Sequence, residues 1–125
     1  MQRAIMELCT TLPDDQLDDG DKILIPGGSV LSGYIRRLID NIGMSTTDPV
    51  IDEEHGWQFL VVDGRRKFLL TVTDLEGMYV LLIEKASHLL VRFFIKDGSI
   101  ENFASLIERE ITKSTVVSMK SIEFK

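Results

Sequence analysis

The spacing of apolar residues changes at Trp57, and this change limits the folds open to the chain. Before Trp57 apolar residues recur at helical spacing, and after it they alternate along short runs. A helix buries a stripe of residues three and four apart, whereas a half-buried strand buries every second residue. The 125 residues therefore predict a single α+β domain, with a helical front part, 1–56, and a sheet-rich back part, 57–125. No Gly/Ser run, Pro run or internal repeat marks a linker between them.

The clearest helix is expected over Ser29–Ile42. Ser29 is a residue type that caps the free amide groups at a helix start, and Gly43 is suited to the left-handed conformation that closes a helix end. The opposite face is polar, which is the pattern of an amphipathic helix on a core. Its expected buried stripe is Val30, Leu31, Tyr34, Ile35, Leu38, Ile39 and Ile42.

Two further segments have helical spacing. Gln2–Leu12 places Ile5, Leu8 and Leu12 on one face and ends before Pro13, because proline disfavours helix in the residue that precedes it. The other segment begins at Ser99, with a stripe of Ile100, Phe103, Leu106, Ile107 and Ile111. A layer of about three helices is therefore expected.

The back part predicts an antiparallel meander. Asp63–Gly64 is read as a tight hairpin turn, which would place Phe59 opposite Phe68 and Trp57 opposite Leu70. A second turn is expected at 74–77. The other expected strands are Met78–Glu84, Leu89–Lys96 (ended by Asp97–Gly98), Thr115–Phe124 and a short one at Lys22–Ile25. The fold class is thus α+β, with a mainly antiparallel sheet of about four to six strands against the helical layer.

The net charge of −6 is unevenly distributed. The front part has eleven acidic and four basic residues, a net of −7, and the back part has nine acidic and ten basic residues, a net of +1. Phosphate backbones would be repelled by most of this surface, so we expect no nucleic-acid partner. Most of the excess lies in two runs, Asp14, Asp15, Asp18, Asp19 and Asp21, and Asp52, Glu53 and Glu54.

These acidic runs do not have the spacing of a metal site. With Gly20 at the invariant glycine of a calcium loop, Leu17 and Pro26 stand where carboxylates are needed. His55 follows the second acidic run, but the other histidine, His88, is 33 residues away, so no converging ligand set is evident. We expect no metal and no cofactor.

Catalytic motifs are also missing. Cys9 is the single cysteine, and no residue in the sequence marks a base that would activate it. No Gly-x-Ser-x-Gly elbow is present. We therefore expect a chain that is not an enzyme. The densest basic cluster, Arg65–Lys67, follows a hairpin turn and is interpreted as charge that protects an exposed sheet edge.

The leading hypothesis is a small acidic, non-catalytic module that binds another protein with a basic surface. The eight acidic residues of the two runs are its candidate contacts. An immunity or antitoxin-like inhibitor fits this charge, since opposite fields accelerate association, and a secretion chaperone or adaptor fits it almost equally well. The sequence leaves the oligomeric state open.

The alternative is a small-ligand-binding protein or an enzyme with an anion site at Pro26–Ser29. Glycines that lead into a helix start can hold a phosphate on free amide groups, so Gly27, Gly28 and Ser29 are its candidate residues. The phosphate-loop pattern is incomplete, because Tyr34 and Ile35 stand where Lys and Ser/Thr are required.

A cytoplasmic location without membrane contact is expected. No run approaches the ~18 apolar residues of a membrane helix, and Glu7 interrupts the position of a secretory apolar core. The single cysteine forms no internal disulfide, which favours a reducing compartment.

Overall fold

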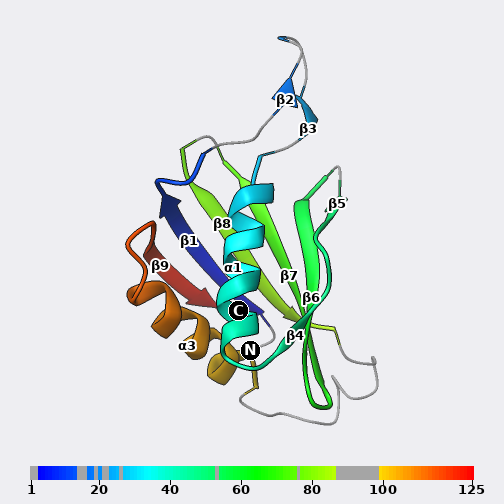
Figure 1. Cartoon of the computed structure of the whole chain (residues 1–125), viewed down its shortest axis with the longest axis vertical. Coiled ribbons are helices and arrows are strands. Elements are labelled where there is room, and N and C mark those ends of the chain that lie inside the picture. Colours follow the sequence, from blue (N-terminus) through cyan, green and yellow to red (C-terminus); the bar gives the residue numbers. More distant parts are fainter. Residues whose placement is uncertain are drawn as a thin grey trace.

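The computed structural model describes residues 3–13, 17–18, 20, 23–25, 27–52, 54–75, 77–86 and 99–125. Its centre is a seven-stranded antiparallel sheet with the order β4-β6-β7-β8-β1-β9, in which β5 also pairs with β6. A separate hairpin, β2 (Leu17–Asp18) and β3 (Ile23–Ile25), projects beyond one end of the sheet (Figure 1). The sheet strands are β1 (Arg3–Thr10), β4 (Ser45–Thr46), β5 (Val50–Asp52), β6 (Gly56–Asp63), β7 (Arg66–Asp74), β8 (Tyr79–Lys85) and β9 (Val117–Phe124).

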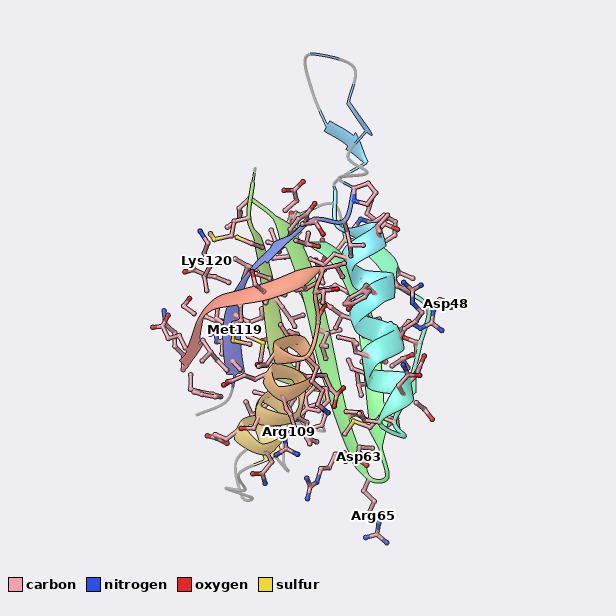
Figure 2. The ribbon with its side chains drawn as sticks, turned by 60° about the vertical axis from the view of Figure 1, so that its left-hand side comes forward. Asp48, Asp63, Arg65, Arg109, Met119 and Lys120 are labelled. Carbon is pink, nitrogen blue, oxygen red and sulfur yellow. The ribbon has the colours of Figure 1, made fainter. Side chains whose placement is uncertain are left out.

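Two helices occur in the described residues, α1 (Ser29–Asn41) and α3 (Ser99–Thr112). Both lie on the same face of the sheet (Figures 1 and 2). The predicted α+β class is confirmed, but the sheet is larger than the expected four to six strands, and the described chain holds two helices rather than about three. No helix in this part of the chain is long and apolar enough to cross a membrane.

The prediction of a helix over Gln2–Leu12 is wrong, because Arg3–Thr10 form β1. Ala4, Met6 and Leu8 are fully buried and alternate with less buried residues. The strand pairs with β8 on one side and β9 on the other. Backbone pairing along both edges and burial of every second side chain therefore override the local helical spacing.

The β6–β7 hairpin has a different register from the one predicted. Asp63 pairs with Arg66, so the two-residue loop is Gly64–Arg65 rather than Asp63–Gly64. Phe59 consequently lies opposite Leu70, and Trp57 opposite Val72. The observed partner of each β6 residue is thus two positions from the predicted partner on β7. A shift by an even number of residues leaves each side chain on its expected face of the sheet.

The start of α1 also differs from expectation. Gly28, with φ 113°, occupies the N-cap position, and no side chain caps the helix. Ser29 is the first helical residue, so its predicted capping role is wrong. The predicted end is confirmed: Gly43 has φ 95°. Its N–H donates to Asp40 O at 3.1 Å, and Met44 N–H donates to Ile39 O at 3.4 Å, which is the Schellman arrangement.

The core lies between the two helices and one face of the sheet. From α1 and α3 it takes Leu31, Ile35 and Ile39, and Ile100, Phe103, Ala104, Ile107 and Ile111. Facing them are alternate residues of the strands: Ala4, Met6, Leu8, Phe59, Val61, Phe68, Leu70, Val72, Tyr79, Leu81, Ile83 and Val117. The helical stripes predicted for α1 and α3 are therefore confirmed in their central positions.

Most of the remaining elements agree with the sequence interpretation. The turn after Asp74 leads into β8, and the tail forms β9. β3 falls within the predicted strand Lys22–Ile25. The predicted strand Leu89–Lys96 and the break at Asp97–Gly98 lie outside the described residues.

Candidate functional site

Acidic turns that are separate in the sequence meet at one end of the sheet. β6 and β7 are antiparallel neighbours, so the turn that precedes β6 lies beside the turn that follows β7. The first turn carries Asp52 and Glu54, and the second begins at Asp74. α1 begins at this end, and the β2–β3 hairpin projects from it (Figure 1). We call Asp52, Glu54 and Asp74 the acidic end.

Asp52 organises the β5–β6 turn through both carboxylate oxygens. Oδ1 accepts a hydrogen bond from Glu54 N–H at 2.9 Å, and Oδ2 lies 3.0 Å from His55 Nδ1. These two hydrogen bonds hold the pKa of Asp52 below its usual value. The same carboxylate raises the pKa of His55, by hydrogen bonding and by its charge. Since the His55 side chain is 61% exposed, this pair lies at the surface and carries a charge that depends on pH.

The β5–β6 turn is attached to the end of β7. Thr73 Oγ1 donates a hydrogen bond to His55 O at 2.5 Å. Gly56, with φ 112°, lies directly against the backbone of Val72 and Thr73. A side chain at this position would collide with the Val72 carbonyl oxygen, so the close approach of the turn to β7 requires glycine.

Exposed apolar residues accompany the acidic residues. Among the described residues, the exposed large hydrophobic side chains are Val50 at 62%, Ile51 at 43% and Leu75 at 51%. Val50 and Ile51 immediately precede Asp52, and Leu75 immediately follows Asp74. Protein-binding surfaces combine apolar contacts with a charged rim. The acidic end has that combination.

A polar network holds the edge strands that lead to this end. Arg36 on α1 contacts Asp48 Oδ1 through Nη1 at 2.8 Å and donates through Nε to Thr46 Oγ1 at 2.8 Å. Thr46 Oγ1 in turn donates to Asp40 Oδ1 at 2.8 Å. The network joins α1 to β4 and to the segment before β5. It therefore positions β5, and with it the acidic turn, relative to the body of the protein.

The opposite end of β6 and β7 is basic. Arg65, Arg66 and Lys67, here called the basic hairpin, are exposed at the β6–β7 turn, where Arg65 points away from the body (Figure 2). Lys67 lies on β7, which pairs with β6 and β8. The interpretation of this cluster as protection of a sheet edge is therefore wrong, because these residues lie at a hairpin tip between interior strands.

The candidate residues of the acidic runs are only partly described. Asp52 and Glu54 lie in the β5–β6 turn, and Asp18 lies in β2. The others, Asp14, Asp15, Asp19, Asp21 and Glu53, are outside the described residues. The sequence analysis missed Asp74 and the apolar residues Val50, Ile51 and Leu75. Val50 and Ile51 precede Asp52 directly in the chain, whereas only the pairing of β6 with β7 brings Asp74 and Leu75 to the same end of the sheet.

The glycine turn of the alternative hypothesis is packed against the sheet. Gly27 and Gly28 are buried, and Ser29 is half-buried. A Cβ at Gly28 would lie 3.2 Å from Val72 Cγ1 and 3.6 Å from Trp57 Cδ1. Tight packing and the positive φ thus give Gly28 a structural reason to be glycine. The anion site itself stays a prediction.

The described residues contain no group of three His, Cys, Asp or Glu side chains placed to hold a metal ion. Comparison with protein-family models and with curated proteins gives no match to this chain.

Proposed function

We propose that the protein is a non-catalytic binding module whose acidic end docks a partner protein with a basic surface. The observation that carries this proposal is that three exposed apolar residues, Val50, Ile51 and Leu75, are chain neighbours of Asp52 and Asp74 in the two turns that meet at this end of the sheet. Apolar side chains supply affinity when they are buried, and the surrounding charges select and steer the partner. An inhibitor of a basic toxin and a chaperone or adaptor are both compatible with such a surface.

The charge of the same end argues against the alternative of an anion-binding pocket. A phosphate at Gly27–Ser29 would lie at the end of the molecule that carries Asp52, Glu54 and Asp74. Like charges raise the free energy of the bound anion. The protein-binding function is therefore the one we favour.

The test is capture of a partner from the native source with two variants of equal charge. In one, Asp52→Lys and Glu54→Lys reverse the acidic end. In the other, Asp63→Lys and Glu123→Lys make the same change of net charge at positions away from the acidic end. We expect the unaltered protein and the second variant to retain one basic protein at low salt and release it at high salt, because exposed charge pairs are screened by salt. The first variant should not retain it.

Two results would contradict the proposal. One is the absence of any retained protein at either salt concentration. The other is equal retention by the two variants, which would place the contact away from the acidic end. Replacement of Leu75 by Ala should weaken capture without a change of net charge, because it removes an exposed apolar contact.

A further inference from the structure

The sheet face opposite the helices carries a cluster of aliphatic side chains, with Glu7 and Glu84 among them. These aliphatic side chains come from four adjacent strands, and each of them is half-buried. No described element lies on this face, since α1 and α3 both cover the other one (Figure 1). Antiparallel sheets that expose one face to water usually carry polar side chains there. The aliphatic residues, here called the open face, are Ile5, Leu60, Val62, Leu69, Val80 and Leu82.

Cross-strand pairing makes the open face continuous. Leu60 lies opposite Leu69, and Ile5 lies opposite Leu82. Beside them Gln58 Nε2 donates to Thr71 Oγ1 at 3.1 Å, so these two polar side chains satisfy one another within the sheet. A partner that covers this face would bury aliphatic carbon and would leave this hydrogen bond in place.

The open face is smaller than the contact area of a standard stable interface. Its four strands, β1, β8, β7 and β6, lie about 4.8 Å apart with a rise of ~3.3 Å per residue, and together span about 19 Å by 25 Å. Stable protein interfaces bury about 800 Å² on each partner. Two sheets of this size can pack face to face with their strands nearly aligned, as in β-sandwiches.

The charges at the two ends of β6 indicate which molecule covers the open face. The acidic turn with Asp52 and Glu54 precedes β6, and the basic hairpin follows it. Consider a two-fold axis that lies between two such faces and crosses the strands at right angles. It sets the strands of the two copies antiparallel and keeps their lateral order. Each acidic turn then meets the basic hairpin of the other copy.

We infer that a second copy of this chain covers the open face in an antiparallel, face-to-face dimer. The aliphatic residues of the two sheets form the centre of the contact, and the two turn-to-hairpin charge pairings lie at its ends. This inference goes beyond the proposed function, because it concerns a different face of the molecule. The two share only the acidic turn.

Sedimentation equilibrium of the full chain at low salt tests the inference. We expect a species of twice the chain mass of 14.1 kDa that dissociates as salt rises. Leu69→Asp, which places a charge at the centre of the open face, should raise the dimer dissociation constant about tenfold or more. A monomer at all concentrations up to about 100 µM, or a dimer that Leu69→Asp does not weaken, would overturn the inference.

A charge exchange provides a second test that does not alter the apolar face. Arg65→Glu with Arg66→Glu should weaken the dimer about tenfold, and so should Asp52→Lys with Glu54→Lys. In the variant that carries all four changes, attraction between acidic and basic groups is restored, and the dissociation constant should return to within about threefold of the original. If the fourfold variant is weaker than either double variant, the antiparallel arrangement is wrong.

The same variants separate this inference from the proposed function. Leu69→Asp should weaken the dimer and leave capture of a basic partner intact, whereas Leu75→Ala should reduce capture and leave the dimer intact. Covering of the open face by a different protein would appear as a mixed complex that Leu69→Asp disrupts, with no dimer of this chain alone. That result would also overturn the inference.

Discussion

Phe68 on β7 and Phe103 on α3 stack in parallel, with ring centroids 4.3 Å apart and an interplanar angle of 7°. Both side chains are almost completely buried. The contact joins the second helix to an interior strand of the sheet. It therefore stabilises the packing of the helical layer on the sheet that carries the acidic end.

Replacement of Phe103 by Ala should lower the free energy of unfolding by about 3–5 kcal/mol, because it removes a buried ring and leaves a cavity against Phe68. Urea denaturation followed by circular dichroism measures this change. Ser105→Ala, at an exposed position of the same helix, is the control and should change stability by less than about 0.5 kcal/mol. A similar loss in both variants would contradict the role given to the stack.

Gly56→Ala should destabilise the protein by at least about 2 kcal/mol. The methyl group would meet the Val72 carbonyl oxygen, and φ 112° is strained for any L side chain. Gly33→Ala is the matched control, because Gly33 lies within α1 and a Cβ there meets no atom within 4 Å. That change should increase stability by about 0.5–1 kcal/mol. Thermal unfolding of the two variants in parallel distinguishes them.

The Asp52–His55 pair should make stability depend on pH in two opposite directions. The raised pKa of His55 means that its contribution is fully present below its unfolded pKa of about 6.5 and is lost as pH rises through the folded value. The lowered pKa of Asp52 means that its contribution is present above about 3.9 and is lost as pH falls through the folded value. The pair should therefore stabilise the turn most between these two limits.

Titration of His55 by NMR measures this coupling directly. We expect a pKa above its ordinary value, and Asp52→Asn should move the pKa of His55 back toward that value, because the partner charge is removed. Glu54→Gln is the comparison, since Glu54 makes only a weaker charge contribution to His55. An unchanged pKa of His55 in Asp52→Asn would show that the carboxylate does not control the imidazole.

Ser114 connects three segments through one hydroxyl group. Its Oγ lies 2.6 Å from Tyr34 Oη and accepts hydrogen bonds from Val116 N–H and Val117 N–H at 3.1 and 3.2 Å. Ser114→Ala should cost about 1–2 kcal/mol, because it leaves backbone donors without a partner. Tyr34→Phe removes one of these contacts and should cost about 0.5–1.5 kcal/mol. Chemical denaturation of the two variants measures both effects, and equal stability of Ser114→Ala and the original protein would contradict this role.

Local sequence patterns predicted correctly those helices and strands whose tertiary contacts favour the same secondary structure. The stripe of α1, the end of that helix at Gly43, the α3 helix and the alternation along β6 to β8 all follow from which side chains avoid water. The distribution of charge could also be predicted from the sequence, because acidic runs that lack the spacing of metal ligands indicate a solvated surface. From this information the α+β class, the helix-covered face of the sheet and the acidic character of the candidate surface could be predicted.

Tertiary structure alone decided the rest. Arg3–Thr10 is a strand because β8 and β9 offer hydrogen-bond partners on both of its edges, and no local signal encodes a pairing with residues more than 70 positions away. The register of the β6–β7 hairpin depends on whether Asp63–Gly64 or Gly64–Arg65 forms the two-residue loop, and the structure has Gly64–Arg65. The acidic end exists because antiparallel pairing places the start of β6 beside the end of β7. Leu75 thereby comes to the same end of the sheet as Asp52, since spatial adjacency in a sheet depends on strand order and not on distance along the chain.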